Sequence, residues 1–123
     1  MISDSEYDLK WKTDFLDAHN TIRKSLSLSL LIWDDQLEKD TLIHVHKMMD
    51  SKQFFHMISL PFLQNIAFGK KNLVEKPHKS IDLWMTDNHK LPIINPNTKK
   101  IGASYSRNSN NDVYISCNYF LEI

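Results

Sequence analysis

The strongest constraint on the fold of this chain is a pair of alternating segments near its C-terminus, residues 101–106 and 113–120. In both segments apolar side chains alternate with polar or small ones, which is typical of β-strands. The polar stretch RNSNND (107–112) separates them and predicts the turn of an antiparallel hairpin. Because Tyr114 and Phe120 make the second face of the hairpin partly apolar as well, we expect other elements to cover both faces.

Helical periodicity dominates the first half of the chain. Five apolar residues recur at spacings of three and four residues: Trp11, Phe15, Ala18, Ile22 and Leu26. This spacing predicts an amphipathic helix over about residues 6–25. The following segment SLSLSL (25–30) alternates with period two but carries no turn signal, so we interpret it as an extended connector.

A second helix is expected to begin at Asp34 or Asp35, whose carboxylates suit an N-cap and the positive end of the helix dipole. Its buried side is marked by Leu37, Thr41, Val45, Met48 and Met49. His44 falls on the same side, which predicts a packed and hydrogen-bonded core histidine, whereas His46 lies off that side and should be solvated. Residues two apart on a helix point in divergent directions, so these two histidines cannot chelate one ion.

A third helix is predicted next to Pro77, because proline is favoured in the first turn of a helix. Its apolar face comprises Ile81, Trp84 and Met85. Trp33 and Trp84 begin or end core-facing segments, so we expect both to be largely buried. Trp11 is expected to be partly exposed.

Composition narrows the class of protein. The 123 residues carry 15 Lys and Arg and 15 Asp and Glu, so the chain lacks the basic footprint of a protein that binds nucleic acid or an anionic membrane. No stretch approaches the roughly 18 apolar residues of a transmembrane helix. A single cysteine, Cys117, excludes an internal disulfide and a cysteine-based zinc site. The length predicts one domain over residues 1–123, with residues 1–5 as a flexible N-terminus.

The N-terminal sequence MISDSEYDLK is acidic and polar, unlike a signal peptide. Two interpretations of the cellular location remain open. The chain is either cytoplasmic, or it is the mature part of a secreted protein to which Met1 was added.

Seven stretches, in the same order along the chain, resemble the CAP superfamily (cysteine-rich secretory protein, antigen 5 and pathogenesis-related 1; the SCP domain). They are AHNTIR (18–23), LIWDDQLEKD (31–40), FFH (54–56), QNIAFG (64–69), LWMTDNH (83–89), NPNTKKIGASY (95–105) and VYISCNY (113–119). Each stretch alone is a weak signal, but together they cover about residues 15–120 with consistent spacing. The short length and the lack of disulfides resemble the bacterial single-domain members.

This resemblance implies an α+β fold, a three-layer α-β-α sandwich with a small, about three-stranded antiparallel sheet between helices. The QNIAFG segment (64–69) is then expected to join the C-terminal hairpin as a strand. Most members are secreted or attached to a surface, which implies an extracellular mature chain, such as an outer-membrane lipoprotein. Cys117, which is paired in disulfide-bearing relatives, is expected to pack here as a small apolar side chain.

The resemblance also implies a cleft formed by two histidines and two acids. His56 and His89 match the histidine positions, and Asp87 keeps the acid that stands three residues after Trp84. Gln64 occupies the other acidic position, and an amide neither takes a proton nor binds a cation tightly. We expect His56, Gln64, Asp87 and His89 to line one cleft without a resident cofactor. His56 and His89 could hold zinc or another divalent cation weakly; the alternative is that the two imidazoles only form hydrogen bonds with Gln64, Asp87 and water.

Asp87 and His89 can share a cleft only if the third helix ends between them, since residues two apart on a helix diverge. The resemblance implies that this helix ends just after Trp84. Asn88 and Pro92 fit such a break, because the residue before a proline is disfavoured in helical geometry.

These observations favour a non-enzymatic, monomeric binding or interaction module, secreted or at a cell surface, whose partner is a protein or a small apolar ligand. The alternatives are a weak divalent-metal-dependent hydrolase, a lipid- or sterol-binding protein and a cytoplasmic structural protein. Catalysis is disfavoured because the residue best placed to act as a base is Gln64. No serine or cysteine stands in a recognisable nucleophile motif.

Overall fold

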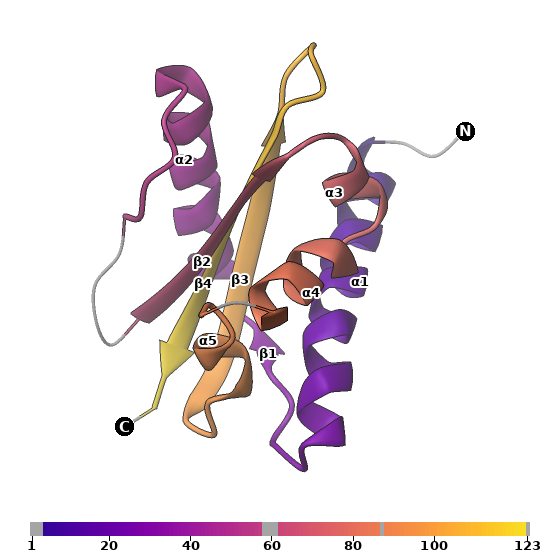
Figure 1. Ribbon diagram of the computed structural model, residues 1–123, viewed down its shortest axis with the longest axis vertical. Helices are drawn as coiled ribbons and strands as arrows, with labels where there is room; N and C mark the ends of the chain where they lie inside the picture. The colour runs from indigo at the N-terminus through magenta and orange to yellow at the C-terminus, as the bar shows by residue number, and fades with distance from the viewer. Residues whose placement is uncertain (1–3, 58–61, 87, 123) are drawn as a thin grey trace.

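A four-stranded sheet lies between two layers of helices in the computed structural model, which describes residues 4–57, 62–86 and 88–122 (Figure 1). The strands are β1 Ile32–Trp33, β2 Phe62–Gly69, β3 Thr98–Arg107 and β4 Val113–Leu121, arranged in the order β1-β3-β4-β2. The helices are α1 Asp4–Ser25, α2 Asp35–Ser51, α3 Asn72–Glu75, α4 His78–Thr86 and α5 Leu91–Ile94. The predicted α+β three-layer sandwich is confirmed.

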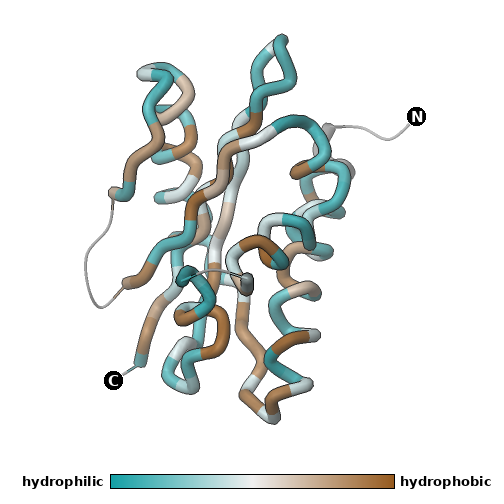
Figure 2. The backbone as a smooth tube through the Cα atoms, in the orientation of Figure 1, coloured by the Kyte–Doolittle hydropathy of each residue, from teal (hydrophilic) through white to brown (hydrophobic). Residues whose placement is uncertain are grey.

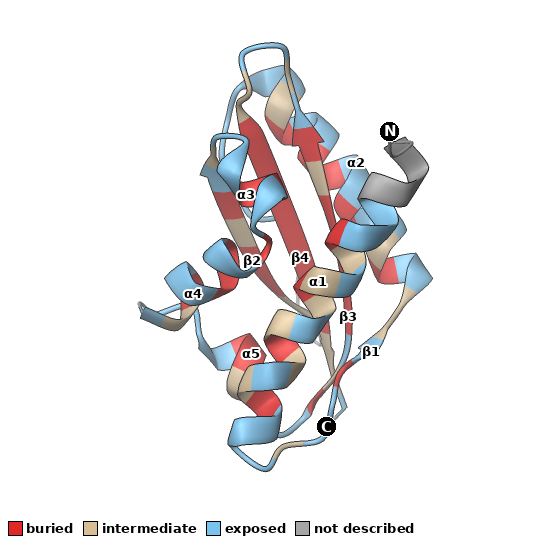
Figure 3. Cartoon of the chain, turned by 90° about the vertical axis from the view of Figure 1, so that its right-hand side faces the viewer, coloured by how far each residue is buried: buried red, intermediate tan, exposed pale blue. Residues whose placement is uncertain are grey.

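The predicted C-terminal hairpin is the centre of the sheet. β3 and β4 pair in antiparallel register from Arg107 opposite Val113 to Thr98 opposite Leu121, and the polar tip between them is hydrophilic (Figure 2). β2 pairs antiparallel with the other side of β4, as the resemblance implied. β1 adds a fourth strand, two residues long and parallel to β3, so the sheet is mixed rather than purely antiparallel. β4 is buried over residues 113–119 because it has strands on both sides and helices on both faces (Figure 3).

The larger core lies on the face of the sheet that α1, α4 and α5 cover. Phe15, Ile81 and Ile93 from these helices have no exposed surface and pack with strand residues such as Ile101 and Ile115. Burying one aliphatic or aromatic side chain of this size contributes about 1.5–3 kcal/mol. This face therefore supplies most of the hydrophobic stabilisation.

The opposite face of the hairpin is small and polar because α2 packs directly against it. A Cβ atom on Gly102 would lie 2.4 Å from the backbone nitrogen of Glu38, so only glycine permits this close approach. Ser104 donates to the carbonyl of Glu38 (3.1 Å), and Ser106 donates to the carbonyl of Val45 (3.1 Å). The α2 layer is thus attached by hydrogen bonds as well as by apolar packing.

The AHNTIR stretch has a structural role. Arg23 is completely buried, and its guanidinium donates to the carbonyls of Ser29 (2.7 Å), Ile93 (2.9 Å), Asn95 (3.0 Å) and Thr98 (3.1 Å). Asn20 holds Leu31 through both backbone groups: its Oδ1 accepts from the Leu31 nitrogen (2.8 Å) and its Nδ2 donates to the Leu31 carbonyl (3.2 Å). These contacts position the connector before β1 without making it a strand, as predicted.

The prediction for the tryptophans was wrong for two of the three. Trp84 is buried, with 2% of its surface exposed, but Trp11 is equally buried and stacks on Phe15 with 4.7 Å between ring centroids. Trp33 is only partly buried, because β1 is an edge strand with a neighbouring strand on one side alone. Packing against neighbouring elements, rather than position in a sequence segment, decides the burial.

Candidate functional site

A groove of about 520 Å³ crosses the outer edge of β2, beyond which the described residues add no further strand to the sheet. We call it the β2-edge groove. Its lining comes from the segment after α2, from β2, from α4 and from the turn after α4: Phe54, Phe55, His56, Ile66, Ala67, Phe68, Leu83, Trp84 and His89. Phe54, Phe68 and Leu83 expose 52%, 53% and 58% of their surfaces. The groove is therefore mainly apolar, with two imidazoles as the ionisable groups of this lining.

Trp84 covers the backbone of β2 at Ile66, within the lining of the groove. Its Nε1 donates to the carbonyl of Ile66 (3.0 Å), so this carbonyl points away from β4 and is already paired. Strand edges with free backbone groups invite pairing with another chain. The indole removes that option at Ile66, and the groove presents side chains there instead.

His56 is oriented by Gln64 of β2. The backbone nitrogen of Met57 donates to Gln64 Oε1 (3.0 Å), and His56 Nδ1 lies 3.1 Å from the same oxygen. Gln64 Nε2 donates to Oδ1 of Asn118 on β4 (2.7 Å). The amide is thus held at both ends, and it fixes the segment that carries His56.

His89 is held through its backbone rather than through a strand or helix. Asn65 of β2 donates from Nδ2 to the His89 carbonyl (3.0 Å) and to the Tyr119 hydroxyl (3.3 Å). The Tyr119 hydroxyl lies 2.7 Å from Nε2 of His19, whose Nδ1 lies 2.9 Å from the carbonyl of Phe15. A carbonyl only accepts, so His19 Nδ1 carries the proton and Tyr119 donates to His19 Nε2.

We call the hydrogen-bonded side chains of Asn65, Tyr119 and His19 the buried relay. His19 is neutral in it. Burial lowers the pKa of His19 to about 4, and burial also raises the pKa of Tyr119 well above its ordinary value. A neutral imidazole and a neutral phenol can form the donor–acceptor sequence described, which links α1 to the turn after α4. The relay was not predicted from the sequence. The residues that could have indicated it, the histidine of AHN and the tyrosine of CNY, lie 100 positions apart.

Three of the four predicted site residues lie in the described part of the chain, and they line two hollows. His56 and His89 line the β2-edge groove. Gln64 contacts His56 but lines a second hollow of about 260 Å³ on the α2 side of the sheet, together with Asp40, His44 and Asn118. Asp87 lies outside the described residues. α4 ends at Thr86 and residues 88–89 form a turn, which confirms that the helix stops before His89.

The described residues do not form a complete metal site. Over 4–57, 62–86 and 88–122, no group of three or more His, Cys, Asp or Glu side chains could hold a metal ion. A tight zinc site needs at least three protein ligands, whereas the groove offers two imidazoles and Gln64 is a neutral amide. Metal binding by His56 and His89 stays a prediction.

His44 and Cys117 are structural, as predicted. The His44 ring is buried, with Nε2 donating to the Phe55 carbonyl (2.7 Å) and Nδ1 accepting from the Ser116 hydroxyl (2.7 Å). Burial lowers the pKa of His44, which favours the neutral ring that this pairing uses. Cys117 is fully buried in β4, and burial raises the pKa of its thiol, so the thiol stays protonated and packs as a small apolar group.

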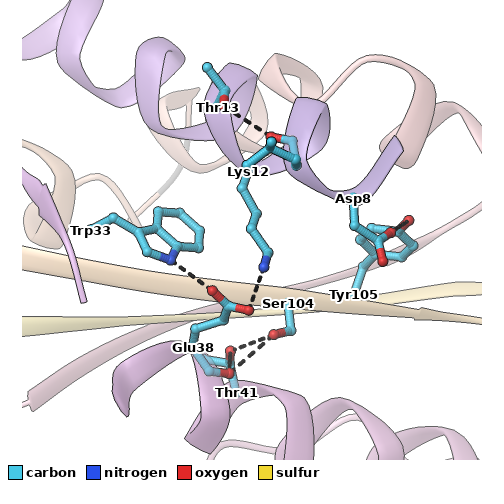
Figure 4. A network of polar contacts seen from close by, with 9 residues as sticks. Asp8, Lys12, Thr13, Trp33, Glu38, Thr41, Ser104 and Tyr105 are labelled. Carbon is cyan, nitrogen blue, oxygen red and sulfur yellow. Dashed lines mark hydrogen bonds and ion pairs between the residues drawn. The ribbon is translucent and has the colours of Figure 1, made fainter. Parts of the chain in front are cut away.

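A third hollow, of about 310 Å³, lies at the opposite edge of the sheet between α1, β1 and α2. Lys12 reaches from α1 to a carboxylate oxygen of Glu38 on α2 (2.6 Å), and Trp33 Nε1 donates to the other oxygen (2.8 Å) (Figure 4). The charged groups Lys12 and Glu38 in this hollow are therefore already paired with each other.

The α-β-α sandwich described above agrees with the CAP class of proteins that the sequence resembles. The family model described as "Cysteine-rich secretory protein family" matches residues 16–119, so this chain belongs to that family. Pathogenesis-related protein 1C of Nicotiana tabacum is 22% identical over 97% of this chain and 80% of the tobacco protein.

Solved structures share the fold. An outer surface protein from Borrelia burgdorferi superposes with a TM-score of 0.75 at 19% identity, over 93% of this chain and 94% of that one. An extracellular protein containing a SCP domain from Bacillus anthracis gives a TM-score of 0.77 at 16% identity, over 99% of this chain and 45% of that one. No helix in the described residues of this chain is long and apolar enough to cross a membrane.

Proposed function

We propose that this chain is a non-enzymatic binding module, secreted or displayed at a cell surface, and that its ligand site is the β2-edge groove. The observation that carries the proposal is the groove lining, in which exposed Phe54, Phe68 and Leu83 accompany the imidazoles of His56 and His89. Large exposed apolar side chains around a hollow favour binding of an apolar ligand or of an apolar side chain from a partner. The surface and extracellular relatives support the proposed location.

The chemistry of the groove argues against hydrolysis. A hydrolase needs a nucleophile or an activated water beside a general base. Among the residues that the structure describes, Ser116 and His44 form a hydrogen-bonded serine–histidine pair, but it is buried between β4 and α2, with Ser116 fully inaccessible. We expect no peptidase or esterase turnover on broad substrate panels. Turnover that His56→Ala abolishes, and that Leu9→Ala leaves unchanged, would establish the hydrolase alternative instead.

Binding in the groove is tested by titration with 4-ethylanisole, an apolar probe without a hydrogen-bond donor, followed in ¹H–¹⁵N NMR spectra. We expect shifts in Ile66, Ala67, Phe68 and Leu83. Leu83→Asp should abolish them by placing a charge in the lining. Leu9→Asp is the matched control, since Leu9 is 65% exposed at the other edge of the sheet.

Shifts that are absent, or that spread equally over both edges, would contradict the proposed site. Location is tested separately, by antibody labelling of intact and of permeabilised cells that express the full-length gene. Labelling only after permeabilisation would exclude display at the surface.

A further inference from the structure

The orientation of the Gln64 side chain follows from one backbone contact. The nitrogen of Met57 lies 3.0 Å from the nearer amide atom of Gln64, and a backbone N–H can only donate. The nearer atom is therefore the oxygen. The amide nitrogen then points to Asn118 Oδ1, at 2.7 Å.

The same oxygen decides which tautomer His56 adopts. His56 Nδ1 lies 3.1 Å from Gln64 Oε1, and an amide oxygen accepts hydrogen bonds but cannot donate them. In the neutral ring the proton is thus on Nδ1, and Nε2 keeps its lone pair. A hydrogen bond to one ring nitrogen fixes the role of the other in this way in many histidine sites.

Nε2 is the nitrogen available to the groove. Nδ1 faces Gln64, which belongs to the neighbouring hollow, while the His56 ring lines the β2-edge groove. Within the described part of the chain, no side chain or backbone group donates to Nε2. The indole N–H of Trp84, a donor in the same lining, is already paired with Ile66.

We infer that Gln64 is a specificity-determining residue: it fixes His56 as a hydrogen-bond acceptor, so the groove prefers apolar ligands that carry a hydrogen-bond donor such as a hydroxyl. This inference rests on the proposed function of the groove. The preference is a property of the amide at position 64. A side chain without an acceptor at position 64 would leave the His56 ring free to take either tautomer.

The tautomer is measured directly in the free protein by two-bond ¹H–¹⁵N NMR of the histidine rings at pH 7. We expect His56 to show a protonated Nδ1 and an unprotonated Nε2. The opposite tautomer would overturn the inference without touching the proposed binding function.

The ligand preference is measured with a matched pair of probes, 4-ethylphenol and 4-ethylanisole, which differ in the donor. In the wild type we expect the phenol to bind roughly three- to tenfold more tightly, the range for one net hydrogen bond. Gln64→Leu, which removes the acceptor for Nδ1, should reduce this ratio to less than about twofold. His56→Phe should also remove the preference while retaining binding of the anisole, because the phenyl ring preserves the apolar lining.

His89→Ala is the control for the second imidazole and should leave the ratio unchanged. If His89→Ala bound both probes equally while His56→Phe still preferred the phenol, the selectivity would belong to His89 and the inference would be overturned. Equal binding of both probes to the wild type would also overturn it, while leaving the binding function intact. Failure of both probes to bind would contradict the inference and the proposed binding function together.

Discussion

The two edges of the sheet handle their polar groups in opposite ways. At the β1 edge, Asn20 holds both backbone groups of Leu31, the Asp34 nitrogen donates to the Ile101 carbonyl (2.8 Å), and Glu38 pairs with Lys12 and Trp33. At the β2 edge, a single indole covers the backbone, and the surrounding aromatic side chains and imidazoles remain at the surface. The polar groups named at the β1 edge are thus bonded to other groups of the protein and stabilise its fold. The β2 edge exposes Phe54, Phe68 and Leu83, and this exposure is the basis of the proposed ligand site.

The largest expected effect separates the two edges by stability. Trp84→Ala should lower the free energy of unfolding by ~3–5 kcal/mol, because a buried indole that packs in the core and caps β2 is lost. Trp33→Ala should cost less, since Trp33 is only partly buried. Urea unfolding of both variants measures the difference. Equal losses would show that the indole at the β1 edge contributes as much to the free energy of unfolding as the one at the β2 edge.

Acid should destabilise the protein through the relay behind the β2 edge. The pKa of His19 is about 4 in the folded chain and about 6.5 in the unfolded chain. Below pH 6.5 the unfolded state therefore binds more protons, and stability falls as the pH falls towards 4. The total loss from this group is about 3 kcal/mol. Buried His44, whose pKa is also lowered, acts in the same direction.

Unfolding free energies between pH 7 and pH 4 test this prediction, with His19→Gln as the variant that removes the titrating group. The slope of stability against pH should be smaller in His19→Gln than in the wild type. An unchanged slope would mean that other groups cause the acid sensitivity.

Tyr119→Phe should cost about 1–3 kcal/mol, because it leaves buried polar atoms of His19 and Asn65 without their partner. It should also shift the NMR signals of the turn at His89, since Asn65 holds that turn. Signals of Leu31 and Trp33 at the β1 edge serve as the internal control. A perturbation of equal size at both edges would show that the relay is not specific to the groove.

The smallest effect is expected at the β1 edge. Lys12→Met removes a partly exposed ion pair with Glu38, and such pairs contribute ~0–1 kcal/mol. The methionine keeps most of the aliphatic packing. The phenol-to-anisole binding ratio should not change; a change would mean that the two edges are coupled.

Sequence patterns predicted the elements that have a period. The hairpin and the first two long helices repeat over enough residues for alternation or 3.6-residue spacing to be visible, and the end of α4 was marked by Asn88 and Pro92. β1 is two residues long and has no period, so it was not predicted. The burial of Trp33 depends on which strand lies at the edge of the sheet, and that of Trp11 on its packing against Tyr105 of β3. Both are tertiary information.

The candidate site was predicted less completely than the fold. The pairing of His56 with His89 followed from the family resemblance, and both line one groove. Gln64 was interpreted as a weakened ligand, because the loss of a carboxylate is visible in the sequence. Its contacts with the Met57 nitrogen and with Asn118 are not visible there, since they join three separate segments of the chain.

The contact between Gln64 and Asn118 also constrains how this protein can evolve. An amide that donates to another amide oxygen needs a partner in the matching orientation. A relative with glutamate at position 64 must turn the Asn118 amide around so that its NH₂ group faces the new carboxylate. A relative with aspartate at position 118 must keep a donor at position 64. The combination of glutamate at position 64 with aspartate at position 118, in which both side chains only accept, should therefore be avoided across members of the family.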